Sequence, residues 1–228
     1  MAEVPATNEN NSAAISGGMV SMDPDDRLRA DTYRLLGRLL ATPPDADLLN
    51  SLAAAPVTED NNLLAVAWRL LAGSASRATP TAVFDEYEAL FIGLGRGELV
   101  PYGSWYLTGF LMEQPLAKLR SDMKKLGFER QDGVHEPEDH AAALCEIMAL
   151  LADDDAPDAL ETQADFFAAH IGPWMARLFR DMQGSASASF YRAVGQLGEQ
   201  FIGTDQRYLE MVERNADVQS DPPRTGIS

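Results

Sequence analysis

Apolar residues recur at helical spacing along almost the whole chain, and this periodicity is the feature that most limits its fold. In the segment 27–41, a stripe at the helical repeat consists of Leu28, Tyr33, Leu36 and Leu40. A wider stripe in the segment 79–94 consists of Val83, Tyr87, Leu90, Phe91 and Leu94. No segment shows a convincing alternation of apolar and polar residues, which is typical of a strand. We therefore expect an all-α protein with roughly ten to eleven helices.

Prolines, glycines and polar clusters separate the helical segments and predict their limits. Asp23 is a candidate N-cap before Pro24, and Gly127 is a candidate C-terminal stop. A polar connector near residues 127–137 acts as a hinge between two unequal halves. We expect a disordered tail over 1–22, helical subdomains over 23–132 and 133–213, and a disordered tail over 214–228.

The charge balance narrows the class of partner. Lys and Arg number 18 against 35 Asp and Glu, which gives a formal net charge of −17. A field of this sign repels phosphate backbones and anionic membrane surfaces, and it attracts basic segments. We therefore expect no nucleic-acid binding, and a cationic peptide is one expected partner. The alternative is that the chain is simply a generally acidic protein.

Cysteine content and hydropathy bear on the compartment. The single cysteine, Cys145, excludes an internal disulfide, and the first residues carry neither a basic start nor a continuous apolar run. No stretch reaches the roughly 18 apolar residues that a membrane-spanning helix needs. We expect a soluble, cytoplasmic protein that does not insert into membranes.

The segment HEPEDHAAALC, residues 135–145, concentrates side chains that can bind metals or transfer protons. On an unbroken helix His140 and Cys145 lie about 140° apart, so they cannot share one ion without other ligands. Asp139 and His140 diverge by about 100°, and no nucleophile motif accompanies them. Cys145 has apolar neighbours, where a buried, inert thiol is expected. We expect no metal site, no cofactor and no catalysis, and we keep a nucleotide-dependent hydrolase using Asp139 and His140 as an alternative.

Helix capping is a structural explanation for the carboxylates of this segment. Pro137 is expected to begin a helix, which places Glu136 at its cap and Glu138 and Asp139 in its first turn. Carboxylates in these positions meet free N–H groups and the positive end of the helix dipole. Capping explains the acidic residues, but it does not explain the proline and the histidine beside them.

A glycine-rich segment, GLGRG at 93–97, precedes an aromatic segment, ELVPYGSWYLTG at 98–109. The glycines follow a helix rather than a strand, which argues against a dinucleotide-binding loop and favours a tight chain reversal. We expect the aromatic segment to be an irregular loop whose rings either cover the edge of the core or line a peptide groove. The residues that crowd this loop are Pro101, Tyr102, Trp105 and Tyr106.

Three segments together resemble a known family. They are YEALFIGLGRGELVPYGSWYL (87–107), EPEDHAAALCEIMALL (136–151) and HIGPWMARLF (170–179). In this order they resemble the TorD/DmsD/NarJ family of cytoplasmic redox-enzyme maturation chaperones. The resemblance extends over about residues 27–212, and the E-P-x-D-H stretch is its most specific part.

The resemblance implies a TorD-like helical bundle without catalysis. Family members bind the twin-arginine signal peptide or the immature form of a molybdopterin-dependent oxidoreductase, and they hold it until the cofactor is inserted. The implied client-binding residues of the hinge are Glu136, Pro137, Asp139 and His140, and those around the groove are Leu90, Phe91, Gly93, Pro101, Tyr102 and Trp105. Some members bind a guanine nucleotide weakly and some form domain-swapped homodimers. The matched residues predict neither property, so a monomer and a swapped dimer both stay open.

Charge and aromatic content agree with this role. A twin-arginine leader has a basic start followed by an apolar stretch, so a protein that binds it needs negative potential and an apolar groove. Asp139 would pair with a leader arginine, and His140 would orient that carboxylate or bind the leader backbone. Protonation of His140 at mildly acidic pH would then change the charge of the site. An all-helical adaptor without such a client is the remaining alternative. The client itself stays open among reductases for dimethyl sulfoxide, trimethylamine N-oxide or nitrate, and formate dehydrogenase.

Overall fold

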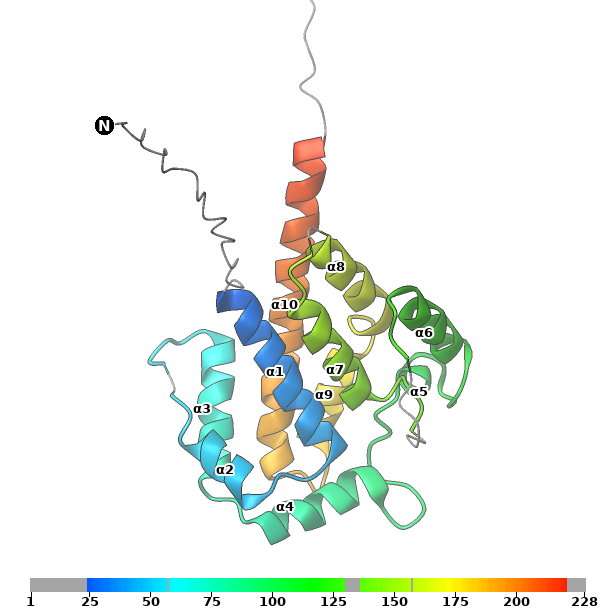
Figure 1. Cartoon of the computed structure of the whole chain (residues 1–228). Helices are drawn as coiled ribbons and strands as arrows, with labels where there is room; N and C mark the ends of the chain where they lie inside the picture. Colours follow the sequence, from blue (N-terminus) through cyan, green and yellow to red (C-terminus); the bar gives the residue numbers. More distant parts are fainter. Residues whose placement is uncertain (1–23, 57, 130–135, 157, 221–228) are drawn as a thin grey trace, which may run out of the picture.

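The computed structural model describes residues 24–56, 58–129, 136–156 and 158–220, and these residues form a helical bundle (Figure 1). Within these ranges there are ten α-helices, one π-helical turn and no strand. In chain order they are α1 (Pro24–Ala41), α2 (Ala46–Ala53), α3 (Leu63–Ala75), α4 (Pro80–Tyr87), η1 (Glu88–Ile92), α5 (Gly103–Thr108), α6 (Gln114–Lys125), α7 (Ala141–Ala152), α8 (Ala159–His170), α9 (Met175–Gly184) and α10 (Phe190–Ser220). The expected all-α fold is confirmed.

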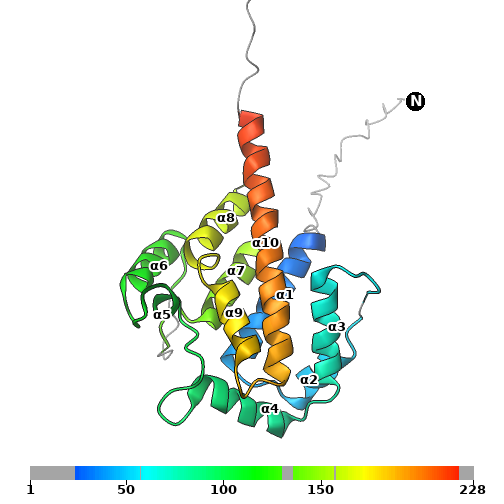
Figure 2. The ribbon, with the colours of Figure 1, turned by 180° about the vertical axis from the view of Figure 1, so that it is seen from behind.

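Helix α10 is the longest element, and it contacts α1, α3, α4, α8 and α9 (Figure 2). Its start is fixed by the buried carboxylate of Glu86 in α4. This carboxylate accepts hydrogen bonds from the backbone N–H groups of Ser189, Phe190 and Tyr191 at 2.7, 3.0 and 2.6 Å. These are the free donors of a helix N-terminus, and a carboxylate there also interacts favourably with the helix dipole. Glu86 therefore joins two elements about a hundred residues apart.

The two halves of the sequence share one core. Helix α1 packs along α7 at the front of the bundle (Figure 1), so the first helix of the chain contacts a helix beyond the hinge. Tyr33, Leu36 and Leu40 of α1 are fully buried, as the stripe predicts, whereas Leu28 is 60% exposed. Cys145 in α7 is also fully buried, and burial raises the pKa of its thiol. The prediction of a buried thiol is confirmed, and its burial and raised pKa are those expected of an unreactive cysteine.

A buried polar network connects three helices. Arg29 of α1 donates from Nε to Asp205 Oδ1 of α10 at 2.5 Å and from Nη1 to Gln163 Oε1 of α8 at 2.9 Å. The hydroxyl of Tyr33 donates to the other Asp205 oxygen at 2.6 Å. Because Arg29 and Asp205 are both buried, each compensates a charge that would otherwise be costly to remove from water.

Some helix limits agree with the predicted ones and others differ. Helix α1 begins at Pro24, and Gly127 with φ 77° follows α6, both as expected. Helix α10 runs on to Ser220, so residues 214–220 are helical rather than a tail. Helix α10 is continuous over its 31 residues, and no proline interrupts it. Asp23 and the proposed tails 1–22 and 221–228 lie outside the described residues.

The aromatic segment is not wholly irregular, because it contains the six-residue helix α5. The chain reversal predicted at residues 93–97 is present, and it depends on glycine at two positions. Gly93 has φ 61°, and a Cβ there would lie 2.2 Å from the carbonyl oxygen of Arg96. A Cβ on Gly97 would lie 2.4 Å from the carbonyl oxygen of Leu90. The close backbone approach at both positions therefore requires glycine. Among the helices described, none has both the length and the apolar character needed to span a bilayer.

Candidate functional site

The hinge segment 136–140 forms a turn before α7 rather than the start of a helix. The backbone N–H of His140 donates to the carbonyl oxygen of Pro137 at 3.1 Å, and α7 begins at Ala141. His140 is the N-cap, because its Nδ1 accepts a hydrogen bond from the backbone N–H of Ala142 at 3.1 Å. The prediction that Pro137 begins the helix is wrong, since the cap is supplied by the histidine three residues later.

Asp139 caps a different helix from the one that follows it. Its Oδ2 accepts a hydrogen bond from the backbone N–H of Ser104 at 2.7 Å, in the first turn of α5. Its carbonyl oxygen accepts from the backbone N–H of Gly103 at 2.9 Å. The backbone N–H of Ala141 in turn donates to the carbonyl oxygen of Pro101 at 2.8 Å. The capping explanation is therefore correct in kind, but the helix that Asp139 caps begins 36 residues earlier in the chain.

These bonds bring the hinge and the aromatic segment together. Tyr102 and His140 form an isolated antiparallel bridge, and their rings meet edge to face at a centroid distance of 5.0 Å. The hydroxyl of Tyr102 donates to Glu136 Oε2. Burial and this bond to a carboxylate raise the pKa of the Tyr102 hydroxyl, so it stays a donor at neutral pH. The structure thus places Pro101, Tyr102, Glu136, Asp139 and His140 in one unit.

Asp139 also lines a pocket of about 320 Å³ between α5, α6, α7 and α8, which we call the Asp139 pocket. Its walls include Gly103, Leu107, Leu119, Leu144 and Trp174. Asp139 is 3% exposed, and its Oδ1 has no hydrogen-bond partner among the residues that the structure describes. A buried carboxylate oxygen without a donor costs free energy, so a donor brought by a bound ligand would be stabilised there.

His170 and Trp174 also line this pocket. The indole Nε1 of Trp174 donates to the carbonyl oxygen of His170 at 2.7 Å. His170 Nε2 lies 3.0 Å from Asp122 Oδ2 and so links α8 to α6. A larger cavity of about 610 Å³ shares Lys118 and His170 with the Asp139 pocket, so the hollow continues along α6 and α8. In the sequence His170 stands out only as the first residue of the HIGPWMARLF segment, which gives no sign that it lines a pocket.

Exposed apolar side chains lie beside the Asp139 pocket. The α5–α6 loop, residues 109–113, joins pocket residues Thr108 and Gln114. Phe110 is 68% exposed and Met112 is 72% exposed. Apolar side chains grouped on a surface loop are typical of an interaction site. The sequence alone does not identify this loop as a candidate site, because no motif distinguishes its apolar residues from those of a helix.

The other predicted site residues lie apart from the Asp139 pocket. Leu90 is fully buried in the core, and Phe91 packs its ring at 5.0 Å from Tyr87 and 5.4 Å from Tyr191. Gly93 makes the turn after η1. Trp105 lines a second cavity with residues of α9, described below. The structure therefore divides the expected single groove into a core stripe and two separate hollows.

The geometry does not support acid–base chemistry at the hinge. Asp139 Oδ2 and His140 Nδ1 each accept a backbone N–H from a different helix, so they are not aimed at a shared proton. Burial lowers the pKa of His140, against the opposing effect of Glu136 and Asp139. Within the described ranges no group of three or more His, Cys, Asp and Glu side chains is placed to hold a metal ion. His135 lies outside the described residues.

Comparison with known proteins places the chain among chaperones. The family model described as nitrate reductase delta subunit matches residues 54–180. The Tat proofreading chaperone DmsD of Salmonella typhimurium is 29% identical over 186 residues, covering 79% of this chain and 90% of that protein. The chaperone protein TorD of Shewanella pealeana is 24% identical over 216 residues, covering 86% and 96%.

Two further matches are shorter or less identical. The chaperone protein TorD of Vibrio cholerae is 27% identical over 130 residues, and the match spans 53% of this chain and 59% of that protein. A crystal structure from Archaeoglobus fulgidus, whose description names redox enzyme maturation, covers 80% of this chain and 94% of its own at 18% identity. Its TM-score of 0.46 is too low to decide the fold.

The family match covers more than half of the chain, and the relatives are named as chaperones rather than as enzymes. The expectation of a protein without catalysis is thereby confirmed. The chain belongs to the nitrate reductase delta subunit family, the TorD/DmsD/NarJ group of redox-enzyme maturation chaperones.

Proposed function

We propose that this chaperone acts in the cytoplasm by binding the twin-arginine signal peptide of a molybdopterin-dependent oxidoreductase. It holds the immature enzyme until the cofactor is inserted, and it needs no cofactor of its own. The name of the DmsD relative, which refers to Tat proofreading, supports this choice of client. The alternative of an adaptor without a signal-peptide client makes no use of the Asp139 pocket.

One observation carries the proposal. Asp139 lines a pocket that adjoins the exposed Phe110 and Met112, and its Oδ1 is buried without a donor among the described residues. A leader arginine would give Oδ1 a charge-assisted hydrogen bond, which is stronger than a neutral one. The apolar stretch that follows the arginines would lie on the α5–α6 loop and remove both surfaces from water. The net charge of −17 would steer the basic leader toward the protein.

Isothermal titration of the full chain with a synthetic twin-arginine leader of a molybdoenzyme encoded beside it tests this proposal. Asp139→Asn keeps an oxygen for the Ser104 N–H and removes the charge, so the fold is preserved. We expect this variant to bind the leader about tenfold more weakly. Asp85→Asn is the matched control, because Asp85 is exposed on α4 away from the pocket lining. Equal affinities for Asp139→Asn, Asp85→Asn and the natural chain would show that the leader binds elsewhere.

The oligomeric state stays a prediction. A monomer and a domain-swapped homodimer both keep the Asp139 pocket available if α5 to α8 come from one unit. Size-exclusion chromatography with light scattering, with and without the leader peptide, distinguishes these two states.

A further inference from the structure

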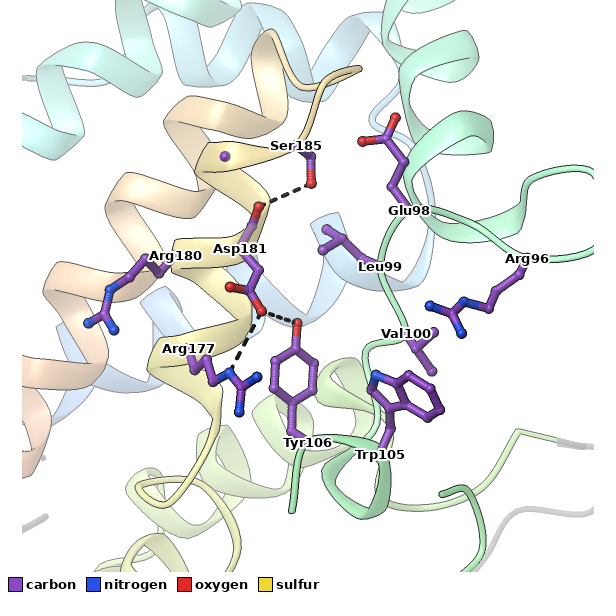
Figure 3. A pocket seen from close by; sticks show the side chains of 11 residues that line it. Arg96, Glu98, Leu99, Val100, Trp105, Tyr106, Arg177, Arg180, Asp181 and Ser185 are labelled. Carbon is purple, nitrogen blue, oxygen red and sulfur yellow. Dashed lines mark hydrogen bonds and ion pairs between the residues drawn. The ribbon is translucent and has the colours of Figure 1, made fainter. Parts of the chain in front are cut away.

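A second hollow, of about 450 Å³, lies between α5, α9 and residues 96–100, and we call it the arginine cavity. Its lining includes Arg96, Arg177 and Arg180, although the whole chain has only 18 Lys and Arg residues against 35 acidic ones. Three arginines thus line one cavity of a protein whose charge is −17, although the Arg180 side chain pairs with Glu199 and points away from the cavity (Figure 3). This local concentration of positive charge is opposite in sign to the net charge of the protein.

The acidic residues of the arginine cavity already have internal donors. Glu98 accepts hydrogen bonds from the backbone N–H groups of Ala186 and Ser187 at 2.9 and 3.2 Å, and from the Ser187 hydroxyl. Asp181 Oδ2 accepts from the hydroxyl of Tyr106 at 3.1 Å. Both carboxylates are therefore engaged in holding the walls together.

Two of the three arginines are not fully neutralised. Arg180 pairs with Glu199 through hydrogen bonds of 3.0 and 2.8 Å, but Arg177 Nε is 4.0 Å from Asp181. Arg96 has no carboxylate partner anywhere in the part of the chain that the structure describes. An unpaired guanidinium facing a cavity is a ready donor for an anionic ligand.

Aromatic rings hold these two guanidinium groups at the cavity. The Cζ of Arg96 lies 4.8 Å from the centroid of the Trp105 ring, and that of Arg177 lies 5.5 Å from the Tyr106 ring. Figure 3 shows Arg96 and Arg177 on opposite sides of the cavity, with Trp105 and Tyr106 between them. Stacking on a ring leaves the N–H edge of a guanidinium open, so each can still bind a carboxylate.

We propose that the arginine cavity binds an acidic peptide segment of the client, with separate carboxylates on Arg96 and Arg177. The charge complementarity excludes the basic leader from this cavity, because the twin arginines would meet Arg96 and Arg177. Helix α5 thus separates two sites of opposite preference, with Trp105 and Tyr106 lining the arginine cavity and Gly103 and Leu107 lining the Asp139 pocket. The identity of the partner rests on the proposed function, whereas the preference for carboxylates does not.

Titration of the full chain at low ionic strength with the peptide Ac-GEGEGEGE-NH2 tests the site, with Ac-GQGQGQGQ-NH2 as the uncharged probe. We expect binding of the glutamate peptide only, and about tenfold weaker binding by the double variant Arg96→Gln/Arg177→Gln. The control Arg27→Gln/Arg207→Gln removes the same charge from exposed positions outside the cavity lining, and it should keep the natural affinity. Circular dichroism of all variants confirms that the helices are intact.

Three results would overturn this inference. They are equal binding of the two peptides, an equal loss of affinity in the control, and binding of inorganic phosphate as tight as that of the glutamate peptide. Leader binding is measured on the same variants, and Arg96→Gln/Arg177→Gln should leave it within about twofold of the natural chain. If the glutamate peptide does not bind but the leader does, the inference about the arginine cavity fails and the proposed function stands. If the glutamate peptide binds but the leader does not, the proposed function fails and the preference of the cavity for carboxylates stands.

Discussion

The Oδ2 atom of Asp139 accepts the backbone N–H of Ser104 at 2.7 Å, so a hinge carboxylate fixes the first turn of a helix that lines both candidate sites. The other oxygen of the same carboxylate is buried without a donor. One carboxylate oxygen of Asp139 therefore holds α5 in place, and the other makes no hydrogen bond to any residue that the structure describes. This division allows stability and client binding to be measured separately.

Replacing Asp139 by alanine should destabilise the fold, whereas replacing it by asparagine should not. Asp139→Ala leaves the Ser104 N–H buried without an acceptor, and loss of such a cap costs about 1–2 kcal/mol. Asp139→Asn keeps the acceptor, so its free energy of unfolding should stay within about 0.5 kcal/mol of the natural chain. Urea unfolding followed by circular dichroism measures both. Equal stabilities for the alanine and asparagine variants would contradict the capping role.

Phe110 of the α5–α6 loop should contribute to leader binding. Phe110→Ser removes an exposed apolar side chain beside the Asp139 pocket, and we expect about a tenfold loss of leader affinity without loss of stability. Phe84→Ser is the matched control, since Phe84 is half exposed on α4 and absent from the pocket lining. Isothermal titration with the leader peptide compares the two variants. The assignment fails if Phe84→Ser weakens binding as much as Phe110→Ser does.

The buried network of α1, α8 and α10 should be sensitive to the loss of one charge. Asp205→Ala leaves Arg29 buried without its main partner, and breaking a buried pair costs about 3–5 kcal/mol. Asp31→Ala breaks only an exposed pair with Arg34, which should cost less than about 1 kcal/mol. Denaturant unfolding of both variants gives the two free energies. Similar losses for the two substitutions would show that burial is not what makes the Arg29–Asp205 pair important.

Stability should fall as the pH drops below 6.5, the ordinary pKa of histidine. Burial lowers the pKa of His140 and of His170 in the folded chain, although Glu136 and Asp139 oppose this shift at His140 and Asp122 opposes it at His170. Between the folded and unfolded pKa values the unfolded chain binds more protons than the folded chain. The contribution of the two histidines to the free energy of unfolding is therefore complete above pH 6.5. It is lost as the pH falls toward their pKa values in the folded chain.

His140→Asn isolates one of these two histidines. Asparagine is a good N-cap acceptor and does not titrate, so it should keep α7 in place and reduce the dependence of stability on pH. The free energy of unfolding is compared for the two chains at neutral and mildly acidic pH. An unchanged dependence in His140→Asn would mean that His140 does not contribute to it. The expected effect of His140 is thus on stability, because its ring caps α7 and does not line the Asp139 pocket.

The sequence predicts the helices well where their signals are local. The stripe of α1, the proline at its start and the glycine after α6 all depend on residues within one or two turns. Helix α5 was not predicted, because it has only six residues and Asp139 caps it from 35 positions after Ser104. The predicted start of α7 was wrong because proline is common at the first position of a helix, whereas histidine is an uncommon N-cap.

The site was predictable in part. The hinge residues Asp139 and His140 and the loop residues Pro101 and Tyr102 do lie together, as the resemblance implies. The sequence could not indicate that Trp105 faces another cavity, because its stacking on Arg96 depends on how the chain reverses at the glycines. Nor could it reveal which carboxylates are engaged by backbone donors, since those donors come from distant elements.

A double-mutant cycle between Asp139 and the leader arginines tests the central claim most directly. Affinities are measured for the natural chain and Asp139→Asn, each with the natural leader and with a leader whose two arginines are replaced by glutamine. We predict a coupling free energy of about 1–3 kcal/mol, because the charge on Asp139 matters only when an arginine is present. A coupling of zero, with Asp139→Asn weakening both leaders equally, would contradict direct contact between Asp139 and the twin arginines.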